Sequence, residues 1–165
     1  MRTVSMSFLI NADADEAYAL LADFSNYQVY ADAVNKVEIS EIGETSCVSA
    51  WDVKFRDGLL RWSEQDQFFP DRHRIEFYQI KGDLDVFEGW WQVEASTEHG
   101  VRLEFVATLD MGLPQLEKLL EPIAEQALRE NMTSIVKGLF RNSFIDNTKA
   151  VSDPLCPADD LVKEG

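Results

Sequence analysis

Two carboxylates, two residues apart in an otherwise apolar strand pattern, are the side chains best placed to do chemistry. Leu60, Trp62 and Phe68 share a parity in this segment, and Glu64 and Asp66 fall on the same parity. Because alternate residues of a strand share one face, both carboxylates should face what the apolar side chains face, about 6–7 Å apart. In a cavity, desolvation and mutual repulsion would raise at least one pKa, as a general acid or base at neutral pH requires. Alternatively, the strand twists or bulges and both acids reach solvent at a sheet edge.

A third polar candidate lies in a long helical pattern near the C-terminus. Ala127, Asn131 and Ile135 recur at a spacing of four, so the amide of Asn131 should point where its neighbours are apolar. A buried amide needs hydrogen-bond partners, which are either a ligand carbonyl or backbone and water.

Aromatic side chains are the candidates for binding a flat ligand, with core packing as the alternative for each of them. The candidates come from several predicted elements: Tyr27, Tyr30, Trp51, Trp62, Phe77, Trp91 and Phe105. The chain has no phosphate-binding glycine loop, dinucleotide fingerprint or nucleophile elbow. Its histidines, His73 and His99, sit at predicted turns. We therefore expect neither a metal site nor a cofactor.

The elements that must position these residues come in an informative order. An alternating strand pattern over 4–10 is followed by two short helical stretches, the first starting after Asp13 and the second capped by Ser25 or Asn26. Six further strand patterns follow between residues 34 and 109, with Asp57-Gly58 as the clearest hairpin turn. One long amphipathic helix, over about 114–141, comes last.

This order predicts an α+β fold of the helix-grip kind. A curved antiparallel sheet of seven strands and a single long helix can bury both apolar faces only if the sheet wraps around the helix, which usually leaves a cavity between them. Residues 1–144 should form one domain. The polar segment 145–165, with Pro154 and Pro157, should be a flexible acidic tail.

Charge and composition exclude several classes of partner. Asp and Glu number 30 against 15 Lys and Arg, giving a formal net charge of −15. Nucleic acids and anionic membrane surfaces both require clustered basic residues, so neither is an expected partner. The sequence has no signal-like start and no apolar run of about 20 residues, which predicts a cytoplasmic protein without an integral membrane segment.

Several segments together resemble the START-like (SRPBCC) polyketide cyclase/dehydratase superfamily. They are the opening strand and helix over 4–10 and 15–23, the strand at 36–39, Gly89-Trp90-Trp91, and 129–132 on the last helix. The resemblance covers roughly 2–142 and is nearest to bacterial type II polyketide aromatase/cyclases, with the coenzyme-Q-binding branch also similar. It implies a helix-grip fold whose interior pocket folds a linear poly-β-ketone and promotes regiospecific aldol closure and dehydration.

The chain departs from the resembled cyclases at two positions. They commonly carry an arginine four residues after the tryptophan that matches Trp62, where this chain has Asp66, and a histidine that some members carry corresponds to Ala107. Arginine-assisted enolate stabilisation therefore does not carry over. We expect Asp66 to transfer the proton, Glu64 to tune it or orient water, and Asn131 with a tyrosine to donate to the oxyanion.

Three functions follow as alternatives. The first is an aromatase/cyclase-like enzyme acting on a polyketide held by an acyl carrier protein. The second is a non-catalytic carrier of a hydrophobic ligand such as an isoprenoid quinone or lipid, and the third is an interaction module with a filled core. Because carrier proteins are usually acidic, docking would require a local basic patch, with candidates Arg56, Arg61, Arg72, Arg74 and Lys81.

Overall fold

The computed structural model describes residues 1–95 and 100–145, and the predicted tail lies outside this range apart from its first residue. The chain begins with strand β1 (Arg2–Ile10), helix α1 (Ala14–Ala22), a 3₁₀ turn (Phe24–Asn26) and the short helix α2 (Tyr27–Tyr30). Six strands follow: β2 (Val34–Ser40), β3 (Ser46–Phe55), β4 (Gly58–Phe69), β5 (Arg74–Gly82), β6 (Val86–Ala95) and β7 (Val101–Asp110). The last elements are helix α3 (Glu117–Leu139) and the two-residue strand β8 (Phe144–Ile145).

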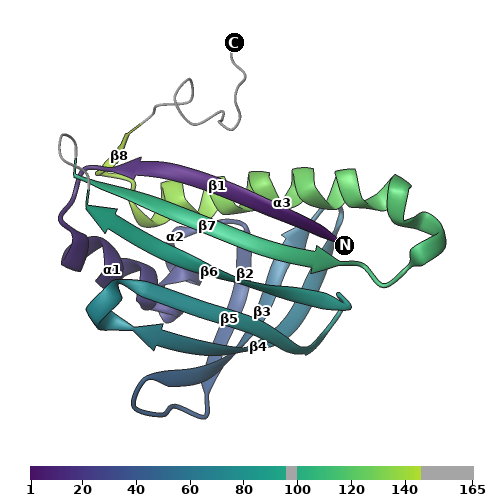
Figure 1. Ribbon diagram of the computed structural model, residues 1–165, viewed down its shortest axis with the longest axis horizontal. Helices are drawn as coiled ribbons and strands as arrows, with labels where there is room; N and C mark the ends of the chain where they lie inside the picture. Colours follow the sequence, from purple (N-terminus) through teal and green to yellow (C-terminus); the bar gives the residue numbers. More distant parts are fainter. Residues whose placement is uncertain (96–99, 146–165) are drawn as a thin grey trace.

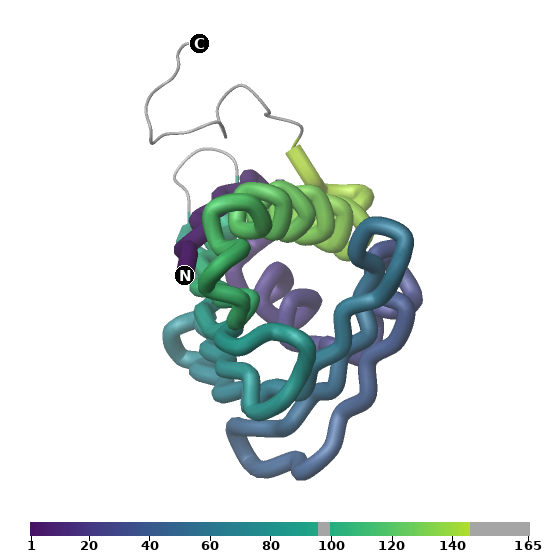
Figure 2. Tube along the Cα trace, turned by 90° about the vertical axis from the view of Figure 1, so that its right-hand side faces the viewer, coloured from purple at the N-terminus to yellow at the C-terminus, as the bar shows by residue number. Residues whose placement is uncertain are grey.

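The described strands form one antiparallel sheet in the order β2-β3-β4-β5-β6-β7-β1-β8. Each strand from β2 to β7 pairs with the next in sequence, and β1 then pairs along β7 from Arg2 opposite Leu109 to Ile10 opposite Val101. The sheet curves around α3, which runs along its concave side (Figures 1 and 2). The predicted helix-grip fold is confirmed, with β8 as an additional strand beside β1.

Local sequence signals explain where the helices start. The carboxylate of Asp13 accepts a hydrogen bond from the backbone N–H of Glu16 at 2.8 Å, which caps α1 as its spacing predicted. Pro114 opens a 3₁₀ turn (Pro114–Leu116), so the α-helical hydrogen bonding of α3 begins only at Glu117. None of the helices in the described ranges is long and apolar enough to cross a membrane.

Helix α3 closes the concave side of the sheet and also holds α2 in place. Its buried residues include Ala124, Ala127, Ile135 and Val136, which face the strands. Gly138 lets the backbone of α2 approach closely, because a Cβ at this position would lie 2.1 Å from the carbonyl oxygen of Tyr30. The ends of α2 and α3 are thus in direct backbone contact.

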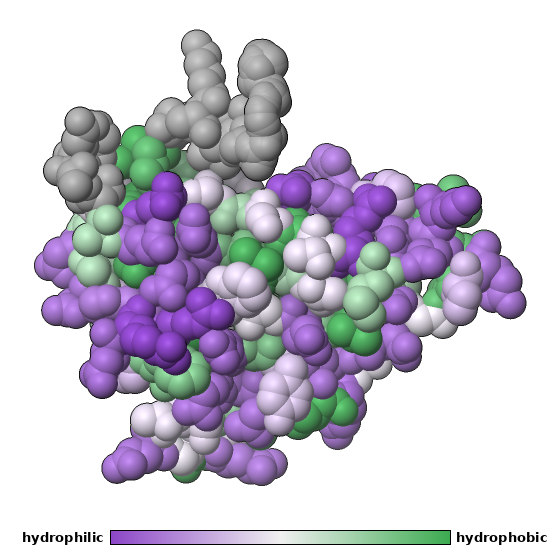
Figure 3. Space-filling model, viewed as in Figure 1, coloured by the Kyte–Doolittle hydropathy of each residue, from purple (hydrophilic) through white to green (hydrophobic). Residues whose placement is uncertain are grey.

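The face of the molecule seen in Figure 3 has fewer clustered apolar side chains than the interior. The face seen in Figure 3 is largely hydrophilic, with small separate hydrophobic patches. Most aromatic side chains of the described strands instead point inward, including Trp51, Phe77, Trp91 and Phe105. The interior is therefore where an apolar ligand would find a matching surface.

Candidate functional site

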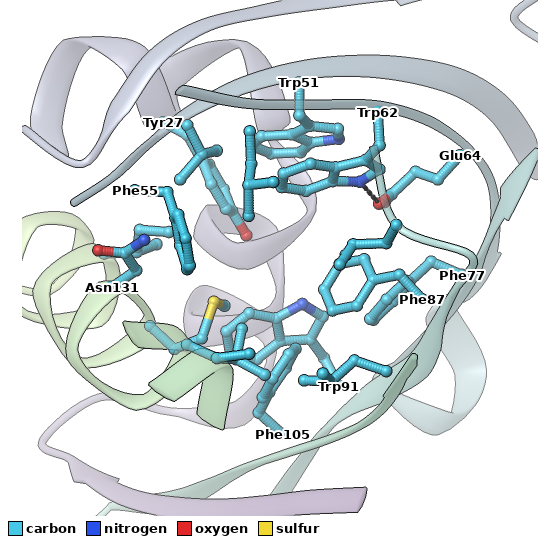
Figure 4. Close-up of a pocket in the computed structure, with 18 of the residues that line it drawn as sticks. Tyr27, Trp51, Phe55, Trp62, Glu64, Phe77, Phe87, Trp91, Phe105 and Asn131 are labelled. Atoms are coloured by element: carbon cyan, nitrogen blue, oxygen red, sulfur yellow. Dashed lines mark hydrogen bonds between the residues drawn. The ribbon is translucent and has the colours of Figure 1, made fainter. Parts of the chain in front are cut away.

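A cavity of about 90 Å³ lies between the concave face of the sheet and α3 (Figure 4). Apolar and aromatic side chains make up most of its wall, and the residues that keep some exposure lie near the end of β3, the start of β4 and α3. This side forms the opening. The lining residues are Phe24, Tyr27, Trp51, Val53, Phe55, Leu60, Trp62, Glu64, Phe77, Leu84, Phe87, Trp91, Phe105, Leu109, Ala124, Leu128, Asn131, Met132 and Ile135.

Two pairs of near-parallel rings give the cavity flat walls. Trp51 and Trp62 are directly opposite each other on β3 and β4, and their rings lie 11° from parallel with centroids 6.1 Å apart. Phe77 and Phe105 form a second pair with the same interplanar angle and separation. Trp91 packs on Phe105 at 4.6 Å, and Figure 4 shows these side chains across the cavity from the tryptophan pair. Flat, apolar walls of this kind suit a planar hydrophobic ligand.

Six of the seven aromatic residues considered from the sequence line the cavity, but Tyr30 does not. Its side chain is 45% exposed, and its ring packs under the guanidinium group of Arg141 at 5.6 Å. Helix α2 ends at Tyr30, where the chain turns toward β2. Tyr30 is therefore a surface residue in this structure.

The two strand carboxylates are both buried, and only one of them reaches the cavity. Glu64 is 5% exposed and lines the cavity, whereas Asp66 is 0% exposed and lies behind it, between Cys47 on β3 and Phe77 on β5. A register irregularity between Ser63 and Glu64 does not turn either side chain outward. The sheet-edge alternative is thus excluded, and Asp66 cannot contact a ligand in this conformation.

Hydrogen bonds connect each carboxylate to one of the two stacked tryptophans. The indole N–H of Trp62 donates to Glu64 Oε1 at 2.7 Å. On the other side, the indole N–H of Trp51 donates to Ser49 Oγ at 2.7 Å, and Ser49 donates in turn to Asp66 Oδ2 at 2.5 Å. Both acids are therefore fixed by donors from β3 and β4.

Burial favours the protonated form of Glu64 over that of Asp66. Desolvation raises the pKa of Glu64 well above its ordinary value, and the hydrogen bond to Asp66 and the charge of Asp66 raise it further. Burial also raises the pKa of Asp66, but hydrogen bonds from Glu64, Ser49 and Cys47 oppose that rise. Among the described residues, Asp66 Oδ1 is buried without a hydrogen-bond partner, and the neighbouring Glu64 can donate to Asp66 when it is protonated.

The amide of Asn131 and the hydroxyl of Tyr27 each donate a hydrogen bond to a backbone carbonyl oxygen. Asn131 lies across the cavity from Glu64 (Figure 4), at the opening, and its Nδ2 donates to the carbonyl oxygen of Lys54 at 2.8 Å. One N–H of its amide and its Oδ1 stay available. The hydroxyl of Tyr27 donates to the carbonyl oxygen of Leu21 at 2.6 Å, and burial raises its pKa well above the usual value. Tyr27 is thus a neutral phenol whose proton is already in use.

Sequence reasoning missed Ser49, although the sequence contains the signal. The Asp57-Gly58 turn sets the β3–β4 register, which places Phe55 opposite Gly58 and hence Ser49 opposite Glu64. Counting back from this turn would have identified Ser49 as an inward-facing hydroxyl beside the two acids.

The comparison with known families agrees with this geometry. The family described as "Polyketide cyclase / dehydrase and lipid transport" matches residues 10–136. This chain belongs to that family. No curated protein matches the sequence.

Solved structures similar to this polyketide cyclase/dehydrase-family chain share its architecture. The protein TTHA0849 from Thermus thermophilus is 25% identical with a TM-score of 0.79, covering 85% of this chain and 95% of its own. The Zhui aromatase/cyclase from Streptomyces sp. R1128 is 18% identical with a TM-score of 0.75, covering 86% and 92%. A START superfamily protein from Mycobacterium smegmatis is 15% identical with a TM-score of 0.72, covering 85% and 97%. The last two likenesses show a shared fold.

Proposed function

We propose that this protein is a polyketide cyclase that binds a linear poly-β-ketone in the aromatic cavity and promotes its regiospecific aldol closure and dehydration, with Glu64 as the proton-transfer group. The observation that carries the proposal is the buried carboxyl group of Glu64 facing an aromatic cavity, where desolvation raises its pKa well above the ordinary value. The family match and the fold shared with an aromatase/cyclase support the same reaction class.

In the proposed chemistry, Glu64 acts first as a general acid and then as a general base. Glu64 donates a hydrogen bond to the oxygen of the ketone whose carbon is attacked by an enol carbon of the same chain. As the carbon–carbon bond forms, Glu64 transfers its proton to this oxygen and the enol O–H proton passes to water. The resulting Glu64 carboxylate then removes a proton from the carbon next to the new alcohol. Glu64 passes that proton to the alcohol oxygen, which leaves as water, and the carboxylate then takes back its resting proton from solvent, which balances the proton released from the enol.

Asp66 and Asn131 take supporting roles in this scheme. Asp66 was expected from the sequence to transfer the proton itself, but its burial behind Glu64 makes it the acceptor that positions the Glu64 proton. The free N–H of Asn131 is the second donor, on the opposite side of the cavity. Tyr27 adds no donor, because its hydroxyl is bonded to Leu21.

The size of the cavity limits how much of a substrate enters. A cavity of about 150 Å³ holds one benzene molecule, and this cavity is about 90 Å³. The cavity in this conformation is thus smaller than one aromatic ring requires, so it must widen at the opening near Asn131 to admit the reacting part of the chain, and the rest of the chain extends through this opening. Held there, the chain can remain attached to a cytoplasmic acyl carrier protein. Among the candidate docking residues, Arg61 and Arg74 are paired with Asp52 and Glu76, which leaves Arg56, Arg72 and Lys81 as better candidates.

A reconstituted polyketide synthase tests the proposal. Adding the wild-type protein should shift the products from a mixture toward one cyclised compound, and Glu64→Gln should lower this selectivity by about 100-fold or more, as expected for loss of general acid–base catalysis. The exposed acid Glu38 on β2 provides the control, and Glu38→Gln should behave as wild type. A product distribution that does not respond to the wild-type protein would contradict the proposal.

The second candidate is a non-catalytic carrier of an isoprenoid quinone or lipid. The dominance of apolar lining residues and the family description, which includes lipid transport, favour it. Native mass spectrometry of freshly purified protein separates the two. A stoichiometric ligand that remains unchanged after incubation supports the carrier, and an empty protein that redirects cyclisation supports the enzyme.

A further inference from the structure

The described wall of the cavity offers no positively charged partner to a negatively charged ligand. Within the described ranges, the lining residues include no lysine, arginine or histidine. The polar groups are the carboxyl group of Glu64 in the interior, the amide of Asn131 at the opening and the hydroxyl of Tyr27, which is bonded to the backbone. The indole N–H groups of Trp51, Trp62 and Trp91 are neutral donors, and the first two are already bonded to Ser49 and Glu64. A carboxylate or phosphate taken inside would lose its water shell without gaining an opposite charge, which is strongly unfavourable.

The groups around Glu64 also disfavour an anionic ligand. The titratable side chains that face it are Asp66 on β4, Cys47 on β3 and Tyr27 on α2. Burial raises the pKa of Cys47 to about 12 and also raises that of Tyr27, so both stay neutral and neither compensates an anion. Asp66 lies directly behind Glu64, and hydrogen bonds from Ser49 and Cys47 favour its ionised form against the effect of burial. The inner end of the cavity therefore has a neutral donor in front of a buried anion.

A neutral donor at the inner end of the cavity matches a ligand that carries a ketone oxygen. The second oxygen of Glu64 is free of Trp62, whose indole N–H binds Oε1. A ligand ketone can take the place of Asp66 as the acceptor of the Glu64 proton, which exchanges one hydrogen bond for another in a dry site. The ring pairs Trp51–Trp62 and Phe77–Phe105 favour a flat ligand between them.

We infer that the cavity takes an uncharged, flat ligand that presents a carbonyl or similar acceptor oxygen to Glu64, and that it excludes carboxylates such as fatty acids. This inference rests on the proposed function for the location of the site, but it concerns binding alone. Two features select an uncharged ligand: the carboxyl group of Glu64 and the absence of a cation in the described wall. For a poly-β-ketone, it means that the neutral diketone portion enters, while a free terminal carboxylate stays outside.

Matched pairs of small probes test the inference by isothermal titration calorimetry at pH 7. Acetophenone is compared with benzoate and 2-acetylnaphthalene with 2-naphthoate, because each pair keeps the ring and exchanges a ketone for a carboxylate. We expect the ketone to bind at least about tenfold more tightly in each pair, the order of the penalty for an unpaired buried charge. Glu64→Gln, which keeps a donor, should bind the ketone within a few-fold of wild type, and Glu64→Leu should weaken it clearly.

The outcomes separate this inference from the proposed function. Equal or tighter binding of the carboxylate overturns the charge selectivity while leaving the cavity as the binding site. Failure of all four probes to bind the folded wild-type protein overturns both. A ketone preference in a protein that does not alter cyclisation upholds the inference and removes the catalytic proposal. Glu38→Gln serves as the surface-charge control and should leave all four affinities unchanged.

Discussion

At the scale of single residues, the central feature is the unequal placement of two neighbouring carboxylates. Glu64 reaches the cavity and Asp66 lies behind it, although both point to the same face of β4. The period of a strand predicts the face of a side chain but not its depth below the curved surface of a sheet. Depth depends on neighbouring strands, here Cys47 and Phe77 beside Asp66. The sequence could therefore identify the pair, but not which member meets a ligand.

The raised pKa of Glu64 also predicts how stability changes with pH. The native state keeps a proton on Glu64 above pH 4.5, where an ordinary glutamate ionises, so it binds more protons than the unfolded state in this range. The stabilisation is complete below that pH and is lost as the pH rises through the raised pKa. Within this window, the free energy of unfolding of wild type should fall relative to Glu64→Gln by up to about 1.4 kcal/mol per pH unit.

Urea unfolding of both proteins between pH 4 and pH 9 measures this difference. Glu38→Gln is the control, since Glu38 is exposed and its replacement should leave the wild-type slope unchanged. Parallel stability curves for wild type and Glu64→Gln over this whole range would mean that Glu64 is already ionised in the native state.

At the scale of elements, the order of strands and helices was predictable because the alternation is strong. The patterns over 4–10 and 101–109 correspond to β1 and β7, which pair along their full lengths. Strand β8 was not predicted, because two residues carry no periodicity. Tyr30 was assigned to the wrong environment for a related reason, since α2 is only four residues long and its helical face is not maintained beyond Tyr27. Short elements are defined by tertiary contacts more than by their own pattern.

The contact between α2 and α3 gives a prediction at this scale. Gly138→Ala should place a methyl group 2.1 Å from the carbonyl oxygen of Tyr30, so the two helix ends must separate. We expect a loss of about 1–3 kcal/mol in the free energy of unfolding, the usual cost of overpacking. Because Tyr27 on α2 lines the cavity, ligand affinity should fall as well.

Gly58→Ala is the matched control for this substitution. A Cβ at Gly58 meets only the carbonyl oxygen of Phe55, at 3.9 Å, an ordinary contact. Thermal or urea unfolding should therefore separate the two alanine variants. Equal stability of Gly138→Ala and wild type would show that α2 and α3 are not held together at this point.

At the scale of the whole molecule, charge and apolar surface are segregated. The chain has a formal net charge of −15, while the described cavity wall contains one acid and no base. The family and the fold follow from patterns spread along the chain, and both were identified from the sequence. The cavity volume and the different protonation of Glu64 and Asp66 could not be predicted from the sequence. Both depend on how the β3–β4 hairpin and α3 enclose the side chains between them.

The most direct measurement of the central claim is a carboxyl-carbon NMR titration of protein labelled with ¹³C at its glutamate and aspartate side chains. One glutamate resonance should remain that of a protonated carboxyl group at pH 7, and it should be missing from Glu64→Gln. In Asp66→Asn, the same resonance should titrate at a lower pH, because the hydrogen bond to the neighbouring carboxylate and its charge no longer hold the proton on Glu64. A spectrum in which every glutamate is ionised by pH 6 would contradict the account.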